Sequence, residues 1–251
     1  MAGTTARFEG KTAIVTGAGS GIGMATALRL AVEGARVIAS DVSQERLDAL
    51  VAEHPDAGFV AVAGDIAGED TAQALVAAAG ERVDVLVNNA GIMDAFLPAA
   101  EVDDATWERV MNVNVTAIMR LTRAVLPKMI EAGGGTIVNV TSEAGLRGSA
   151  AGVAYTTSKH AVIGYTKNTA FMYAPKGIRV NAVAPGATAT NIEAPWKSEW
   201  AQGRLGPLMQ VVIPSVATPE QLAAAITWLA SDDSANVTGV VLASDGGWSA
   251  I

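Results

Sequence analysis

The chain alternates short runs of apolar, β-branched residues with longer, alanine-rich stretches whose apolar positions recur at helical spacing. Glycine follows several of the helical stretches, for instance after Glu33 and Ala79, and stops them. Strands are predicted at 12–16, 36–40, 59–63, 83–87, 136–141, 178–183 and 240–243. Helices are predicted at 21–33, from the N-cap Ser43 to 53, at 69–79, at 104–130 with a break before Pro127, at 152–173 and at 219–230.

Repeated strand–helix–strand units predict an α/β fold, because right-handed crossovers place parallel strands side by side with helices on both faces. The fold expected is a single Rossmann-type, doubly wound, seven-stranded parallel sheet. We find no linker or low-complexity segment, so residues 1–251 are predicted to form one dinucleotide-binding and catalytic domain. Only the proline-rich residues 187–219 depart from this alternation of strands and helices, and we interpret them as a substrate lid.

Composition excludes several classes of function. The 251 residues contain no cysteine, so disulfides, thiolate metal sites and cysteine nucleophiles are absent. With His54 and His160 as the only histidines, no metal site is expected. The net charge of −8 disfavours a nucleic-acid partner. No apolar run approaches the roughly 18 residues of a membrane span, and the first residues lack a signal-peptide core, so a cytoplasmic protein without a membrane partner is expected.

A glycine-rich turn follows the first predicted strand: residues 16–23 are TGAGSGIG, and a helix is predicted to start within it. Such a turn lets the backbone approach a pyrophosphate, and the helix N-terminus attracts its charge. The turn is weak evidence alone, since it can be an ordinary strand–helix connection. Asp41 ends the second strand, where a carboxylate can bind the adenosine ribose and repel the extra phosphate of NADP. We therefore predict NAD in preference to NADP.

Tyr155 and Lys159 lie four residues apart in a predicted helix, so their side chains share one face. The pair alone could be a solvated helix face. A phenol with a pKa near 10 becomes a base at neutral pH only if the phenolate is stabilised, and a nearby ammonium can do so. Ser142 follows the fifth predicted strand and could hold a substrate oxygen by a hydrogen bond.

Taken together, these residues resemble the short-chain dehydrogenase/reductase family in its compact form, over almost the whole chain. The motifs that carry the resemblance are TGAGSGIG at 16–23, Asp41, GDI at 64–66, NNAG at 88–91, NVNV at 112–115, Ser142, YTTSK at 155–159, and PGATAT at 185–190. The C-terminal segment DGGW at 245–248 also resembles the family's closing segment. Their joint order is far more specific than any single motif.

The resemblance implies roles for individual residues. Tyr155 would be the general acid/base, Ser142 would orient the substrate oxygen, and Lys159 would hold the nicotinamide ribose and depress the tyrosine pKa. Asn114 would organise a proton relay. The implied cofactor-binding residues are Gly17, Ser20, Ile22, Asp41, Asp65, Ile66, Asn89, Ala90, Gly91, Tyr155, Lys159, Pro185, Gly186, Thr188 and Thr190. Thr188 stands where the family usually has Ile or Val. A homotetramer is implied as well.

The predicted activity is NAD-dependent interconversion of a secondary alcohol and a ketone by hydride transfer, on a bulky or cyclic apolar substrate. Ile192, Trp196 and Trp200 are spaced at four, which predicts a short helix with one apolar face that either covers the substrate or packs on the body. Met93, Ala144, Arg147 and Met209 are further candidate wall residues. Two alternatives remain open: a catalytically silent dinucleotide sensor, because fold does not dictate function, and a reductase of carbon–carbon double bonds.

Overall fold

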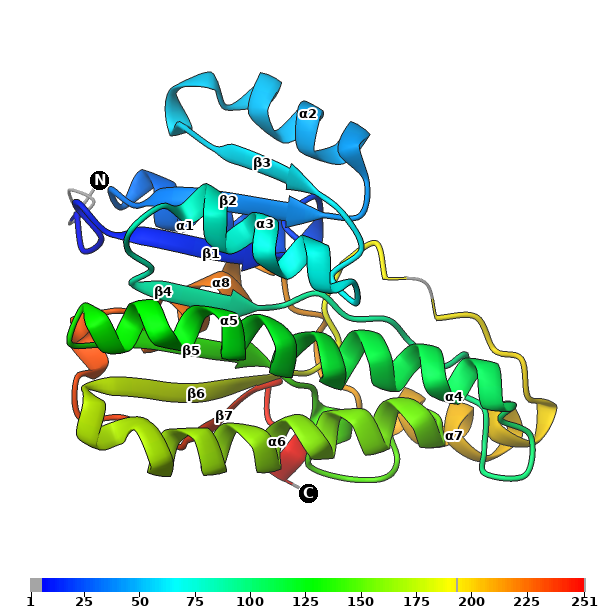
Figure 1. Ribbon diagram of the computed structural model, residues 1–251. Helices are drawn as coiled ribbons and strands as arrows, with labels where there is room; N and C mark the ends of the chain where they lie inside the picture. The colour runs from blue at the N-terminus through cyan, green and yellow to red at the C-terminus, as the bar shows by residue number, and fades with distance from the viewer. Residues whose placement is uncertain (1–5, 193, 251) are drawn as a thin grey trace.

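The computed structural model describes residues 6–192 and 194–250, which contain a seven-stranded parallel sheet (Figure 1). Its strands are β1 (Thr12–Thr16), β2 (Arg36–Asp41), β3 (Val60–Ala63), β4 (Val85–Asn88), β5 (Gly135–Val140), β6 (Ile178–Pro185) and β7 (Val241–Ser244). They lie in the order β3-β2-β1-β4-β5-β6-β7. This confirms the predicted fold class. The order reverses direction between β1 and β4, and doubly wound sheets bind their ligands at that point, beyond the carboxyl ends of the strands.

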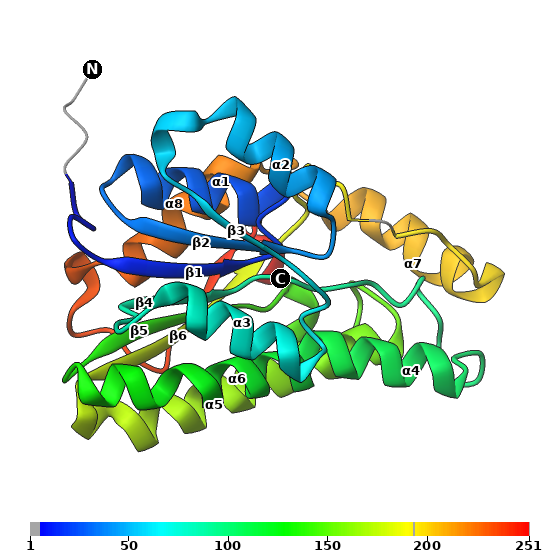
Figure 2. The ribbon, with the colours of Figure 1, turned by 45° about the horizontal axis from the view of Figure 1, so that its top comes forward.

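Helices cover both faces of the sheet (Figure 2). One layer consists of α1 (Gly21–Val32), α2 (Gln44–Glu53) and α8 (Pro219–Ala230), and the other of α3 (Glu69–Ala79), α5 (Ala117–Glu131) and α6 (Val153–Tyr173). Strand β1 serves both layers: Val15 packs with Leu30 of α1, and Ile14 packs with Leu121 of α5. Burial on two faces explains the continuous apolar runs. No helix in the described part of the chain is both long and apolar enough to cross a bilayer.

The predicted break before Pro127 is wrong. Pro127 lies inside α5, where Val125, Leu126 and Met129 are buried on either side of it and hold the helix against the sheet. The irregularity occurs earlier, between α4 (Asp104–Met111) and α5, as a π-helical turn, η2 (Asn112–Thr116). A proline removes one backbone hydrogen bond, and packing on both sides outweighs that loss. Single π-helical turns are frequent at functional sites.

The predicted helix through Ile192, Trp196 and Trp200 is also wrong. Helix α7 (Glu199–Val212) begins only after Ser198, whose hydroxyl accepts from the N–H of Ala201 at 3.0 Å. Pro195 disfavours a helix in the residue before it. Figure 1 shows α7 and α4 beyond the tips of the strands. A parallel bridge between Thr188 and Ala217 closes the base of the 187–219 segment. The single domain and the lid remain predictions.

Candidate active site

The glycine-rich turn lies at the centre of the sheet, between β1 and α1. Gly17 and Gly21 have φ angles of 65° and 53°, which favour glycine. A Cβ on Gly23 would stand 2.0 Å from the carbonyl oxygen of Gly17, so no other residue fits there. Asn89 follows β4, and its Nδ2 donates to the carbonyl oxygens of Thr16 at 2.9 Å and Gly17 at 3.3 Å. These bonds hold the turn in place where the strand order reverses, between β1 and β4.

Asp41 reaches back from β2 to this turn. Its carboxylate accepts from the N–H of Gly19 at 3.0 Å and from that of Ser43 at 3.0 Å. A Cβ on Gly19 would lie 2.8 Å from both the Asp41 carboxylate and the Cβ of Arg46. Sequence reasoning missed Arg46, an exposed cation in the first turns of α2, because it does not immediately follow Asp41. Both signs of charge therefore stand beside the place expected for the adenosine ribose.

A cavity of about 370 Å³ adjoins the turn. Its lining includes Gly19, Ser20, Gly21, Arg46 and Thr190. A Cβ on Gly21 would approach Thr190 Cβ to 3.1 Å, so the segment after β6 lies directly against the turn. The hydroxyl of Ser20, at the start of α1, makes no capping hydrogen bond. Free backbone donors at a helix start, glycines without room for a Cβ and a cavity of this size fit a dinucleotide's phosphates.

Most of the other predicted cofactor residues lie at or just after the carboxyl ends of strands. Asp65 is exposed after β3 and accepts from the N–H of Ala67, while Ile66 packs inward against the core. Ala90 donates its N–H to the Thr16 hydroxyl at 3.1 Å. Pro185 ends β6, Gly186 lies against Asp245, and Thr188 forms the bridge to Ala217. Ile22 is partly buried in α1.

Tyr155 and Lys159 lie in the first two turns of α6, and both are buried. The Nζ of Lys159 stands 5.4 Å from the centroid of the Tyr155 ring and donates to the carbonyl oxygen of Val140 at 3.0 Å. Across the described residues, no carboxylate lies within ion-pair distance of this Nζ. Ser142, just after β5, lies next to the Tyr155 phenol and lowers the pKa of that phenol. The three side chains thus meet at one place.

The π-helical turn η2 brings Asn114 to the same place. Its Nδ2 donates to the carbonyl oxygen of Ile92 at 3.0 Å and to the Ser158 hydroxyl at 3.0 Å, and its Oδ1 accepts from the Ile92 N–H at 2.9 Å. A Cβ on Gly91 would lie 3.3 Å from Asn114 Oδ1 and 3.4 Å from Lys159 Nζ. Gly91, Asn114 and Lys159 therefore surround one small space, which only a glycine at 91 leaves open.

Burial shifts both titratable groups of the cluster toward their neutral forms. It raises the pKa of Tyr155 to about 12; the hydrogen bond with Ser142 opposes this shift and the charge of Asp94 adds to it. Burial also lowers the pKa of Lys159 to about 8. A further positive charge in the cleft would lower the pKa of the phenol.

The candidate wall residues separate into two groups. Met93 and Ala144 pack against Tyr155 in one small apolar cluster. Arg147 instead pairs with the buried Glu143, with 2.6 Å between Nε and Oε1. Met209 lies on α7, and Ile192 and Trp200 are exposed. Met93 and Ala144 therefore lie beside the Tyr155 phenol, whereas Trp200 lies on the surface.

Sequence reasoning also missed Asp94 and Phe96, both buried in the loop between β4 and α4. Asp94 accepts from the N–H of Tyr155 at 2.8 Å, and the Phe96 ring stacks on Trp196. A signal was present: Asp94 is a lone carboxylate inside the apolar run IMDAFL, and a charge in such a run is buried at a cost unless it is well bonded.

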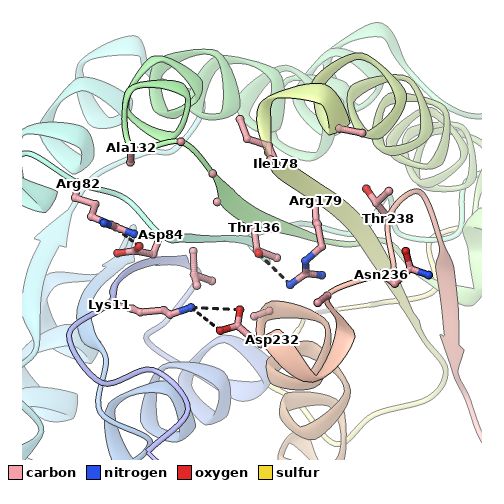
Figure 3. A pocket seen from close by; sticks show the side chains of 18 residues that line it. Lys11, Arg82, Asp84, Ala132, Thr136, Ile178, Arg179, Asp232, Asn236 and Thr238 are labelled. Carbon is pink, nitrogen blue, oxygen red and sulfur yellow. Dashed lines mark hydrogen bonds and ion pairs between the residues drawn. The ribbon is translucent and has the colours of Figure 1, made fainter.

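A larger cavity, of about 470 Å³, lies at the opposite end of the sheet (Figure 3). There Lys11 pairs with Asp232, and Arg82 pairs with Asp84 at 2.6 Å. Arg179 donates to the Thr136 hydroxyl at 3.1 Å and to backbone carbonyls. Because these charged groups already have partners, the cavity lacks the open donors of the phosphate turn.

Comparisons with known proteins agree with this geometry. A family model described as short chain dehydrogenase matches residues 11–201. The chain is 42% identical over 250 residues to 3beta-hydroxysteroid dehydrogenase 2 of Eggerthella lenta, covering 97% of this chain and 96% of that protein. It is 41% identical over 249 residues to cis-4-hydroxycyclohexanecarboxylate dehydrogenase of Sinomonas cyclohexanicum, covering 97% and 98%.

A solved structure of a short chain dehydrogenase from Mycobacterium paratuberculosis bound to NAD superposes with a TM-score of 0.88 and 33% identity, covering 98% of this chain and 100% of that one. The chain belongs to the short-chain dehydrogenase family. It is an oxidoreductase of that family, with a fold that suits a nicotinamide dinucleotide.

Proposed function

We propose that the protein interconverts a secondary alcohol and a ketone with NAD, using Tyr155 as the general acid/base. The observation that carries this proposal is the buried cluster beside the phosphate turn: a phenol next to Ser142, with the Lys159 ammonium 5.4 Å from its ring. Names of relatives that act on hydroxysteroids and on a hydroxycyclohexanecarboxylate support an alcohol or ketone substrate with a large apolar part.

The proposed division of labour follows from the contacts. Ser142 and Tyr155 hold the substrate oxygen between two hydroxyls, and Tyr155 takes its proton in oxidation or returns it in reduction. The oxidised nicotinamide, when bound, accepts the hydride and carries a positive charge. Tyr155 needs that charge and the Lys159 ammonium together, because burial and the charge of Asp94, opposed by Ser142, raise its pKa to about 12. Asn114 holds the Ile92 backbone and Ser158 in place behind Lys159.

For the cofactor, the glycines of the turn would receive the pyrophosphate and Asp41 the adenosine ribose. We propose NAD over NADP because Asp41 is buried and already anchored by Gly19 and Ser43, which keeps a carboxylate where the extra phosphate would stand. Arg46, close by, is the residue that could receive that phosphate if the carboxylate were removed. Asp41→Ala should therefore raise kcat/KM with NADP relative to NAD, and a preference of the native protein for NADP would refute the assignment.

The central experiment records NADH absorbance with a panel of secondary alcohols and ketones, small and bulky. We expect turnover with the native protein, and a fall of roughly 10³-fold or more in Tyr155→Phe with NAD affinity retained. No signal across a diverse panel would favour the dinucleotide sensor. An α,β-unsaturated ketone separates the third possibility, since the allylic alcohol is the product expected here and a saturated ketone would indicate reduction of the double bond.

The homotetramer is a proposal that rests on the resemblance to the family, and the cytoplasmic location is a proposal that rests on the sequence pattern. Sedimentation of the purified protein tests the first of them, and a monomeric mass would contradict it.

A further inference from the structure

The four-residue turn 94–97, between β4 and α4, holds the start of the helix that carries Tyr155. Helix α6 begins at Val153, directly after Gly152, an N-cap residue with no side chain to cap the helix. Asp94 supplies the cap from elsewhere in the chain: its carboxylate accepts from the N–H of Gly152 at 3.1 Å and from that of Tyr155 at 2.8 Å. Asp94 is fully buried. One of its two capping bonds thus ends on the backbone of the residue proposed as acid/base.

The backbone of the turn adds a third bond, because the carbonyl oxygen of Leu97 accepts from the N–H of Val153 at 2.9 Å. The approach is close. A Cβ on Gly152 would lie 2.5 Å and 2.6 Å from the two carboxylate oxygens of Asp94 and 2.6 Å from the nitrogen of Leu97. The first turn of α6 therefore follows any displacement of residues 94–97.

The other side of the same turn contacts the 187–198 segment. The Phe96 ring stacks on Trp196 with 3.9 Å between centroids and 16° between planes. The carbonyl oxygen of Ala95 accepts from the N–H of Lys197 at 3.2 Å. Ala95 and Phe96 have φ angles of 57° and 58°, a conformation that non-glycine residues rarely adopt. Contacts on both sides, with the bond from the Phe96 N–H to Asp94 at 3.2 Å, hold the turn in this shape.

We propose that Asp94 is a positioning residue for Tyr155, and that the turn 94–97 couples the phenol to the seating of Trp196 on Phe96. The segment that follows the proposed nicotinamide site then closes over the substrate and aligns the acid/base in one cooperative step. This inference rests on the proposed function, and it assigns roles to three residues outside the motifs of the family resemblance: Asp94, Phe96 and Trp196.

Asp94→Asn removes one carboxylate oxygen and leaves a side chain of the same shape. Because an amide has one acceptor where the carboxylate has two, either Gly152 or Tyr155 loses its bond. We expect kcat to fall 10- to 100-fold while the affinity for NAD changes less than threefold. Asp103→Asn is the matched control: Asp103 caps α4 through the N–H of Thr106 at 2.7 Å, in the same loop but by a bond that does not involve α6, and kcat should stay within twofold.

Trp196→Ala tests the other side of the turn. We expect kcat to fall about 5- to 20-fold and the KM of bulky substrates to rise, whereas Trp228→Ala, on α8, should leave both unchanged. The double variant Asp94→Asn/Trp196→Ala measures the coupling directly. If the turn transmits seating to alignment, its kcat is close to that of the slower single variant. If the two losses in kcat multiply, the coupling is refuted.

The outcomes remain distinguishable from those of the proposed function. If the native protein turns over alcohols and Tyr155→Phe does not, while Asp94→Asn keeps the native kcat, only the present inference fails. If Asp94→Asn does not fold, Phe96→Leu takes its place in the double-variant cycle with Trp196→Ala. Phe96→Leu should then slow kcat with native NAD affinity, and an unchanged kcat overturns the inference.

Discussion

The two ends of the sheet treat their charged side chains in opposite ways. At the amino end, Arg82 pairs with Asp84, Lys11 pairs with Asp232, and Arg179 donates to hydroxyls and carbonyls of three neighbouring segments. At the carboxyl end, Lys159 is buried with one backbone carbonyl as its partner, and burial lowers its pKa to about 8. One end uses charge to join segments; the other keeps a cation in a poorly solvated place.

This difference separates stability from chemistry within one fold. A buried cation with a full set of acceptors contributes to folding, whereas one with few acceptors opposes it and persists where a function requires it. The larger cavity therefore lies at the end where charged pairs join segments, and the smaller one at the end with the proposed active site. The same substitution at the buried Lys159 and at the half-buried Arg179 should consequently give opposite results.

The largest effect is expected for Lys159→Met. We predict a fall in kcat/KM of roughly 10³-fold, because the ammonium proposed to stabilise the phenolate is lost. Stability should not fall with it. The pKa of Lys159 in the folded state, about 8, lies below its ordinary value of 10.5, so the unfolded chain binds more protons between these values and native stability rises as pH increases from about 8 to 10.5.

The Met variant should lack this rise, and at pH 7 it should be at least as stable as the native protein. Urea unfolding at several pH values measures both. A variant destabilised by several kcal/mol at pH 7 would show that the ammonium is well bonded, and the contrast with the amino end would fail.

Arg179→Met, at the amino end, should show the reverse. The guanidinium donates to the carbonyl oxygens of Leu229, Ser231 and Val237, and its loss leaves them without these donors. We predict a loss of about 2–4 kcal/mol in the free energy of unfolding, with kcat/KM changed less than threefold. Arg179→Lys, which keeps the charge but not the fork of donors, should lie between the two proteins. Urea denaturation and the NADH assay measure these effects.

Glu143, next to Ser142, offers a test by pH. Burial raises its pKa to about 7; Arg147 opposes this shift and the charge of Asp245 adds to it. Since the folded protein binds more protons than the unfolded chain between pH 4.5 and 7, this group's contribution to stability is full below pH 4.5 and is lost as pH rises through 7. The loss should be on the order of 1–3 kcal/mol, reduced by the pairing with Arg147.

Glu143→Gln should remove this pH dependence, and unfolding free energies at pH 5 and pH 8 reveal it. Asp245→Asn provides a graded comparison, because it removes the like charge and should lower the pKa of Glu143. If the native protein gains stability from pH 5 to 8 by the same amount as Glu143→Gln, the assignment is wrong.

The sequence predicts the features that depend on local patterns, and it misses those that depend on contacts between distant residues. The doubly wound parallel sheet follows from apolar runs and connection rules, which are local or topological. The strand limits differ from prediction by only one or two residues: β6 runs on to Pro185, and β4 starts at Val85. The π-helical turn at Asn114 and the coil at Trp196 depend on contacts with Ile92 and Phe96, which are distant in sequence. Hydrophobic periodicity cannot predict those contacts.

The site residues divide likewise. Tyr155, Lys159 and Ser142 belong to sequence motifs, so the resemblance to the family predicts them without the structure. Asp94 does its capping for a helix that starts far along the chain, and Arg46 reaches the phosphate turn only because α2 packs beside it. The motif residues can be recognised from their spacing in the sequence. Asp94 and Arg46 can be recognised only from the three-dimensional structure.

The smallest effect is predicted for the pair Lys11–Asp232, which Figure 3 shows at the edge of the larger cavity. Their charged atoms are 3.3 Å apart, but the Asp232 side chain is 84% exposed, so water and salt screen the attraction. Lys11→Met should lower the free energy of unfolding by less than about 0.5 kcal/mol, and this difference should shrink further in 1 M NaCl. Turnover should be unchanged. A loss above about 1.5 kcal/mol, or a slower reaction, would mean that charge at the amino end does more than join segments, and the contrast between the two ends would have to be given up.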